Sequence, residues 1–234
     1  MKLNVSSPAY VIVFVVIFSA VFTAAVVALQ VAAQGRIERS EALRQERALL
    51  TVFGLMEPEA TIDERQVADL VSRRIDSSLE VSDPVTGRKF IVYRAYDGDK
   101  AAGGRLKAIA FVIAGTGFWA PVTGLLSLTP DRTHVIRAVF VEQKETPGLG
   151  GRIAEEQFQK DQFAGLNVSK PPAGRPYVYV AQERPASPAD PRYGRTIEAI
   201  TGATQTSRAV TRFLNVDLEQ FQRAMDAYEK SVRK

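Results

Sequence analysis

The chain of 234 residues contains no cysteine, and this absence excludes several chemistries. Disulfide bonds, Cys-ligated iron–sulfur clusters, thiol nucleophiles and CxxCH haem attachment all require cysteine. Histidine is nearly as scarce, because His134 is the only one. A zinc site built from several histidines is therefore excluded, and a Ser-His-Asp triad has a single candidate. Any electron carrier in this chain would be an organic cofactor or a metal held by oxygen ligands.

The chain also lacks a long run of charge of one sign, although its formal net charge is +4. Basic residues are mixed with acidic ones, as in residues 36–39 (Arg-Ile-Glu-Arg) and 73–76 (Arg-Arg-Ile-Asp). A nucleic-acid-binding surface needs a basic stripe on one face. The sequence therefore predicts no nucleic-acid partner. A hydrophobic content of 46% at this length is typical of one globular domain with a short appendage.

One long apolar run is present, over residues 9–29, and it contains no charge. As a helix it would be about 31 Å long, which is enough to cross the hydrocarbon core of a bilayer. We predict a transmembrane helix over residues 9–33, preceded by a short tail of residues 1–8. A cleaved signal peptide ending near Ala33 is the alternative, but the run is longer than the usual core of such a peptide. The flanking basic residues do not fix the orientation.

The remaining sequence predicts a helical connector over residues 34–80 and one α+β domain over residues 81–234. The connector would hold a helix over 36–56 and a second helix over 61–78 that opens with a capping box at Thr61. Period-two patterns predict strands at residues 90–96, 106–114, 124–129, 134–142 and 177–182. A short helix is expected at residues 155–163 and a closing helix at 206–234. This order of elements favours an antiparallel sheet with flanking helices.

The first of three glycine motifs is Gly115-Thr-Gly-Phe-Trp119-Ala, which fits the GxGxxA pattern of dinucleotide sites. That pattern requires a long helix directly after it, whereas residues 121–130 begin and end with proline. A turn between two strands is therefore favoured. In such a turn, Trp119 would either pack on the core or form a flat wall for an aromatic ligand.

The second motif covers residues 145–151, Glu-Thr-Pro-Gly-Leu-Gly-Gly. The pair Pro147-Gly148 is typical of a type II turn, and the glycines allow a close approach of the backbone to another group. Alone, the motif indicates a structural turn as readily as a ligand loop. Glu142 and Glu145 could form a paired-carboxylate hydrolase site, but the sequence favours solvated acids on a loop.

The third motif is residues 201–207, Thr-Gly-Ala-Thr-Gln-Thr-Ser, directly ahead of the closing helix. The first turn of a helix has free N–H groups and the positive end of the helix dipole, so this segment suits a phosphate group. The ordinary alternative is a Thr or Ser side chain that caps the helix.

In this order, the apolar helix and the three motifs resemble the FMN-binding subunits of two respiratory complexes. These are the C subunit of the sodium-translocating NADH:quinone reductase and the G subunit of the Rnf complex. The resemblance extends to about residue 215, and the segment from Gly115 to Leu128 is closer to the reductase protein. It implies an electron-carrier subunit without a complete active site of its own, in an ion-translocating complex linked to sodium, NAD and ubiquinone. Its expected partners are the other membrane subunits and the lipid bilayer.

The resemblance also implies a covalent cofactor. The last threonine of the family's (S/T)GAT motif, here Thr204, carries FMN as a phosphoester, which a separate flavin transferase attaches outside the cytoplasmic membrane. The main domain is therefore expected on the periplasmic or outer side of the inner membrane. The family usually has Asp three residues ahead of this motif, whereas this chain has Glu198, which puts efficient recognition by the transferase in question.

Further flavin contacts are expected around Thr204. The remaining residues expected to form this cofactor site are Thr201, Gly202, Ala203, Thr206, Ser207, Glu145, Thr146, Gly148, Leu149 and Trp119. Hydroxyl groups of the third motif would stabilise the phosphate, and backbone N–H groups of residues 145–151 would contact the polar edge of the ring. Leu149 and Trp119 would contact its apolar face. Two alternatives stay open: a standalone membrane-anchored flavoprotein that serves another exported reductase, and a non-redox scaffold module.

Overall fold

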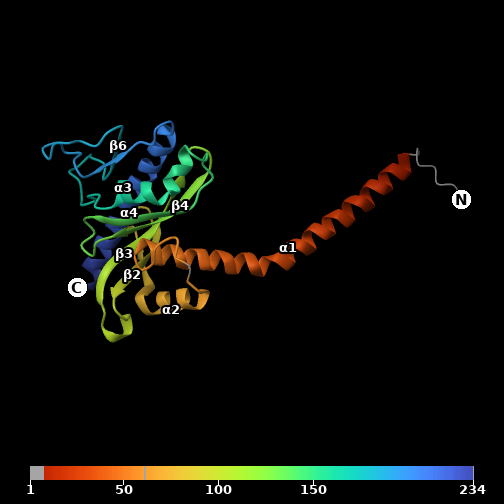
Figure 1. The fold of residues 1–234 in the computed structure, drawn as a ribbon, viewed down its shortest axis with the longest axis horizontal. Helices are drawn as coiled ribbons and strands as arrows, with labels where there is room; N and C mark the ends of the chain where they lie inside the picture. Colours follow the sequence, from red (N-terminus) through yellow and green to blue (C-terminus); the bar gives the residue numbers. More distant parts are fainter. Residues whose placement is uncertain (1–7, 61, 234) are drawn as a thin grey trace. The chain divides into compact units, whose positions relative to one another are not determined.

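The computed structural model describes residues 8–60 and 62–233. The chain divides into two compact units, Met1–Arg44 and Gln45–Lys234. The first unit contains most of helix α1 (Pro8–Val52), shown in Figure 1. Within the described residues, α1 is the one helix long and apolar enough to cross a membrane. The helix continues without interruption into the segment predicted as the start of the connector.

The end of α1 belongs to the second unit. Leu50, Val52 and Phe53 are buried there. The hydroxyl of Ser127 donates a hydrogen bond of 2.7 Å to the backbone oxygen of Val52, which satisfies one of the carbonyl groups left free at a helix end. Gly54 follows with φ of +64°, a left-handed conformation that commonly terminates helices.

Five antiparallel strands form the main sheet in the order β1-β2-β3-β4-β5. Their bounds are β1 Ile75–Ser82, β2 Lys89–Asp97, β3 Arg105–Thr116, β4 Pro121–Leu128 and β5 Val135–Glu142. A small parallel pair, β6 (Tyr179–Ala181) with β7 (Thr196–Glu198), lies beyond the sheet. The fold class predicted from the sequence, an apolar helix followed by an antiparallel sheet with helices, is confirmed.

The predicted end of the second connector helix was wrong. The second helix, predicted over residues 61–78, is α2 (Glu64–Arg74), and the chain turns directly into β1. A bulge between Asp76 and Leu79 breaks the alternation of β1, which explains why its pattern was missed. The predicted capping box begins at Thr61, which lies outside the described residues. At the observed start of α2, Oε1 of Gln66 accepts a hydrogen bond of 3.3 Å from the backbone N–H of Asp63.

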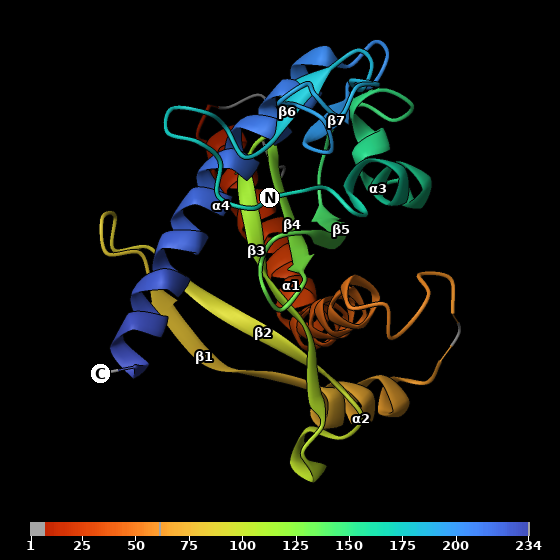
Figure 2. The same cartoon turned by 90° about the vertical axis from the view of Figure 1, so that its left-hand side faces the viewer.

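The closing helix α4 (Thr204–Val232) packs along the sheet (Figure 2). Its Phe221 stacks on Phe111 of β3 with ring centroids 3.9 Å apart, at the centre of the core. Two buried carboxylates hold α4 to the β1–β2 hairpin in reciprocal fashion. Asp83 in the hairpin turn pairs with Arg223 of α4 at 2.9 Å, and Asp217 of α4 pairs with Arg88 beside that turn. A second short helix, α3 (Glu156–Phe163), covers β5.

Candidate functional site

The three glycine motifs meet at one end of the sheet. Strands β3, β4 and β5 are antiparallel neighbours, so the end of β3, the start of β4 and the end of β5 lie at the same edge. The first motif is the hairpin turn between β3 and β4, closed by a hydrogen bond of 2.8 Å from the N–H of Gly117 to the oxygen of Ala120. The second motif follows β5, and the third opens α4. The turn favoured by the sequence over a dinucleotide site is thus confirmed.

Glu145 connects all three motifs. Its Oε1 accepts hydrogen bonds of 2.9 Å from the backbone N–H groups of Phe118 and Trp119. Its Oε2 accepts a hydrogen bond of 2.7 Å from the hydroxyl of Thr206. The residue is 5% exposed, so the interpretation of Glu145 as a solvated loop acid was wrong. Glu142, at the end of β5, is exposed.

The pKa of Glu145 reflects two opposing causes. Burial raises it, while the N–H of Trp119, the hydroxyl of Thr206 and the N–H of Phe118 lower it, and the net result is a pKa below the ordinary value. A carboxylate that accepts several hydrogen bonds is stabilised in its charged form. Glu145 therefore holds a negative charge at neutral pH.

Thr204 is the first residue of α4 and is partly exposed. The N-cap position is occupied by Ala203, and within this described segment no side chain caps the helix. The alternative of an ordinary Thr or Ser cap is therefore wrong. Because a helix leaves its first N–H groups without intrahelical partners, this end keeps donors and a positive dipole for an anion. Gly202, two residues ahead of Thr204, has φ of +78°, a left-handed conformation that favours glycine.

The hydroxyl groups of the third motif do not all lie beside Thr204. Thr206 and Ser207 are buried at 3% and 4% exposure. The Ser207 hydroxyl donates to the oxygen of Ala203 at 3.1 Å and accepts from the N–H of Ile200 at 3.0 Å, while Thr206 bonds to Glu145. These two side chains hold the helix start in place, which corrects the expectation that their hydroxyls face a phosphate. Thr201 is exposed.

The second motif forms the predicted turn. The N–H of Leu149 donates to the oxygen of Thr146 at 3.1 Å, and Gly148 has φ of +73°, as the third position of a type II turn requires. Because the N–H of Leu149 is bonded within the turn, it is not available to a ligand. The Leu149 side chain reaches the third motif, since a Cβ atom built on Gly202 would lie 3.1 Å from its Cδ2.

Exposed apolar side chains surround this meeting point. Trp119 is 69% exposed and Leu149 44%, so Trp119 does not pack on the core. Phe118 was not among the residues predicted from the sequence. It is 52% exposed and lies edge-to-face on Trp119 with ring centroids 4.8 Å apart. Large apolar side chains exposed together often mark a binding surface. The adjacency of two aromatic residues in a turn was the signal that could have identified Phe118.

Glu198 lies at the end of β7 and is partly buried. Its Oε2 accepts a hydrogen bond of 3.4 Å from Nε2 of Gln162. Its backbone N–H donates to Oε1 of the same glutamine at 2.8 Å. The side chain is therefore positioned by α3, ahead of the third motif.

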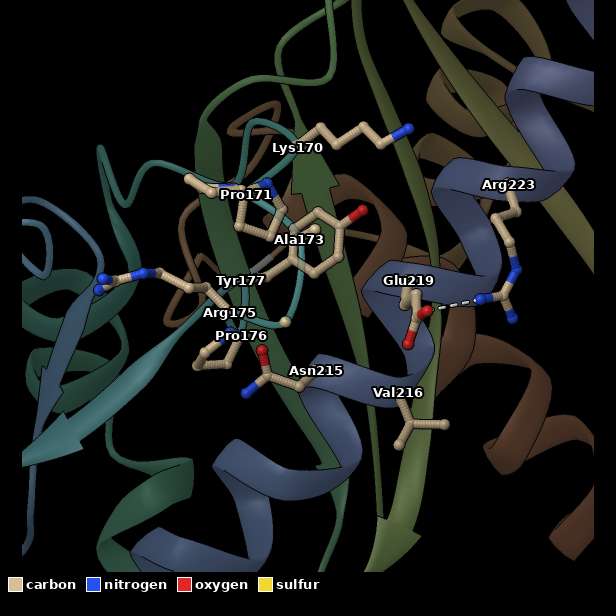
Figure 3. A pocket seen from close by; sticks show the side chains of 12 residues that line it. Lys170, Pro171, Ala173, Arg175, Pro176, Tyr177, Asn215, Val216, Glu219 and Arg223 are labelled. Atoms are coloured by element: carbon tan, nitrogen blue, oxygen red, sulfur yellow. Dashed lines mark hydrogen bonds and ion pairs between the residues drawn. The ribbon is translucent and has the colours of Figure 1, made fainter.

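A separate surface cavity of about 620 Å³ lies between residues 170–177 and the middle of α4 (Figure 3). The basic side chains along it are Lys170, Arg175 and Arg223. Arg223 is already paired with Asp83 and with Glu219, at 2.9 and 2.6 Å. Since this cavity shares no residue with the three motifs, it is not the candidate cofactor site.

Comparison with known proteins agrees with this location. Residues 117–219, which run from the hairpin turn into α4, match the family described as FMN-binding domain. The C subunit of the Na(+)-translocating NADH-quinone reductase of Chlamydia caviae is 29% identical over 136 residues, covering 53% of this chain and 42% of that protein. The same protein of Pasteurella multocida is 33% identical over 109 residues, covering 46% and 38%. The chain thus matches about two fifths of the length of these curated relatives.

Solved structures show the same fold. The crystal structure of NqrC from Shewanella oneidensis matches with a TM-score of 0.60 at 17% identity, covering 81% of this chain and 99% of that one. The crystal structure of the corresponding reductase protein from Parabacteroides distasonis matches with a TM-score of 0.64 at 19% identity, covering 81% and 95%. The fold is therefore that of the solved reductase C subunits, and the matched segment runs from the first motif through the third. The resemblance to the FMN-binding subunit family is confirmed, and the relatives named are C subunits of the sodium-translocating reductase.

Proposed function

We propose that this chain carries FMN through a phosphoester on Thr204 and relays electrons within a membrane-bound, sodium-translocating NADH:quinone reductase. The observation that carries this proposal is the convergence of the three motifs. Glu145 bonds to both the hairpin turn and the first turn of α4, which brings exposed Trp119 and Leu149 to the helix end that begins with Thr204.

The residues present fit a flavin phosphate at this position. The Thr204 hydroxyl is on a partly exposed residue at an uncapped helix start. Esterification leaves the phosphate with a single negative charge, which the helix dipole would stabilise by about 0.3–1 kcal/mol. In forming the ester, the threonine oxygen bonds to phosphorus and loses its proton. The flavin phosphate comes from a donor that holds it as an anhydride. The phosphorus–oxygen bond of that anhydride breaks, and the second phosphate group of the donor leaves with the bonding electrons.

The surrounding side chains suit the ring of the cofactor. When bound, the flavin supplies the ability to accept and release electrons one at a time. The chain's own contribution is to orient and shield it, with Trp119 and Leu149 offering apolar surface to the face of the ring. A covalent tether also prevents loss of the cofactor into a compartment that lacks free FMN.

The proposed parent complex and membrane location are supported by the named relatives and by α1. Their printed names supply the sodium-translocating NADH:quinone reductase as the proposed parent complex. Helix α1 would anchor the chain, and the domain that begins near Gln45 would lie on the outer side of the inner membrane, where the transferase acts. Multi-spanning subunits of the complex would be its electron partners, with NADH and ubiquinone bound elsewhere in the assembly.

The proposal is tested by producing the full chain with and without a flavin transferase. Denatured protein is then separated on a gel, viewed under ultraviolet light and analysed by mass spectrometry. We expect a fluorescent band and a mass increase of one FMN less one water, both lost in Thr204→Ala. Ser77→Ala is the control, because this exposed hydroxyl residue lies outside the three motifs, and the variant should remain fluorescent.

Three outcomes separate the alternatives. A bare Thr204 in protein isolated from its own host, without a yellow chromophore elsewhere, would favour the scaffold module. A flavinylated chain that purifies without large membrane subunits would favour a standalone flavoprotein. Co-purification with such subunits supports the proposed complex.

A further inference from the structure

The carboxylate of Glu145 lies in a cradle that only glycine permits. A Cβ atom built on Gly117 would lie 2.5 Å from Oε1, and one built on Gly150 would lie 2.8 Å from Oε2. The same atom on Gly150 would also lie 2.5 Å from the Thr206 hydroxyl oxygen. Real carbon atoms do not approach oxygen so closely. The two glycines therefore allow the backbone of the first and second motifs to close around one side chain.

Both carboxylate oxygens are used. Two backbone N–H groups, of Phe118 and Trp119, point at Oε1, and the Thr206 hydroxyl points at Oε2. The backbone N–H of Glu145 is itself bonded to Oε1 of Gln143 at 2.7 Å. A buried charge is tolerated only when it is compensated in this way. The arrangement fixes the turn that carries Trp119 relative to the helix turn that carries Thr204.

We propose that Glu145 is a positioning residue that also lowers the reduction potential of the flavin on Thr204. This inference rests on the proposed function. The carboxylate holds the two flavin-facing elements in register, and its fixed negative charge opposes the negative charge that reduction adds. Charges in a water-poor setting interact more strongly than in bulk water, so removal of this charge should be measurable. Glu145 thus acts on the flavin through its charge and through the elements that it holds, without contact to the ring.

The charge is tested with Glu145→Gln in the flavinylated full chain, by spectroelectrochemical titration of the flavin. Glutamine keeps an oxygen that accepts the two N–H bonds but carries no charge. We expect a more positive potential, equivalent to a change on the order of tenfold in the one-electron equilibrium constant, or about 59 mV. Glu142→Gln is the matched control, because that exposed acid is screened by solvent and should change the potential much less. Equal potentials in wild type, Glu145→Gln and Glu142→Gln would overturn the role of the charge.

The positioning role has a readout that does not depend on the flavin. In the protein without cofactor, hydrogen exchange at the amides of Phe118 and Trp119 should be about tenfold faster or more in Glu145→Ala, because these groups lose their acceptor. In Glu145→Gln the two amides should stay protected. Unchanged exchange in Glu145→Ala would overturn the positioning role. If no flavin is attached in wild type, the proposed function fails and so does the potential-lowering role, while the exchange result still decides the positioning role.

Discussion

Gly115 of β3 lies directly against Phe213 of α4. A Cβ atom on Gly115 would be 2.3 Å from the Cβ of Phe213, a distance at which no side chain fits. This contact lets the first turns of α4 lie on the end of β3, next to the hairpin turn that carries Trp119. The position of Thr204 relative to the hairpin therefore depends on the packing of Gly115 against Phe213.

Substitution of Gly115 by alanine should displace α4. We expect Gly115→Ala to lower the free energy of unfolding by about 1–3 kcal/mol, because the added methyl group overpacks the contact with Phe213. Denaturant titration of the full chain in detergent measures this change. Gly35→Ala is the control, since nothing lies within 4 Å of a Cβ at Gly35 and α1 gains a better helix former. Equal free energies for the two variants would contradict the prediction.

Glu198 offers a gain-of-function prediction. The family resembled by the motifs usually has Asp at this position, and the longer side chain of Glu198 here bonds to Gln162 of α3. We expect Glu198→Asp to be flavinylated faster by a transferase adapted to the family pattern, as followed by the time course of gel fluorescence. The control is Glu183→Asp, which shortens an exposed acid outside the motif. A rate for Glu198→Asp equal to or below that of wild type would show that this chain's transferase accepts glutamate.

The sequence predicted most of the sheet because its long strands are apolar runs bounded by Gly, Pro and Asp. Residues 90–96 and 106–114 were recognised as strands; burial largely alternates along β2, whereas β3 is buried without a break from Ala108 to Phe111. Strand β1 was missed, since its bulge interrupts the period. The three-residue strand β7 was missed as well, because so short a segment has no measurable period. Local pattern therefore predicted the long elements and failed at the short and irregular ones.

The candidate site was predicted in its position along the chain but not in its internal contacts. Thr204 was singled out by its motif, and the structure adds that the helix end beside it is uncapped. The role of Glu145 could not be predicted, because its partners Phe118 and Thr206 are far from it in sequence. The sequence shows an acid on a glycine-rich loop, which is usually solvated. Only the tertiary fold shows that three segments enclose it.

The ion pairs of α4 predict a dependence of stability on pH. The pKa of Asp83 is lowered well below its ordinary value, chiefly by hydrogen bonding to the Arg223 side chain. A lowered pKa in the folded state means that this pair stabilises the fold above the unfolded pKa near 4, and that the stabilisation is lost as pH falls through the folded pKa. Asp83→Asn should lower the unfolding free energy at pH 7 by about 1–3 kcal/mol and make the remaining stability less sensitive to acid. Both effects are measured by comparing the thermal unfolding of wild type and Asp83→Asn at intervals of about one pH unit between pH 3 and pH 7.

The pKa of Asp217 is shifted in the direction opposite to that of Asp83, so the two residues can be compared within one protein. Burial raises the pKa of Asp217, against the effects of Arg88 and the N–H of Ala114. Its contribution to stability therefore decreases as pH rises from the unfolded pKa through the folded one. Asp217→Asn should flatten the pH profile above pH 4 in the direction opposite to Asp83→Asn. Identical profiles for the two variants would contradict this assignment of signs.

Trp119 allows the proposed flavin position to be followed by fluorescence, because it is the only tryptophan in the chain. Its indole is 69% exposed beside the helix end that begins with Thr204. A flavin ring on Thr204 that stacks near this indole should quench its emission and protect it from acrylamide, since aromatic rings in contact exclude solvent and transfer excitation. We expect strong emission and ready quenching in Thr204→Ala, and weak, protected emission in flavinylated wild type. Flavinylated Ser77→Ala, with its substitution outside the three motifs, should behave as wild type does. If flavinylated wild type and Thr204→Ala showed the same emission and the same accessibility to acrylamide, the ring would lie away from Trp119, and the flavin would depend on other side chains for its apolar contacts.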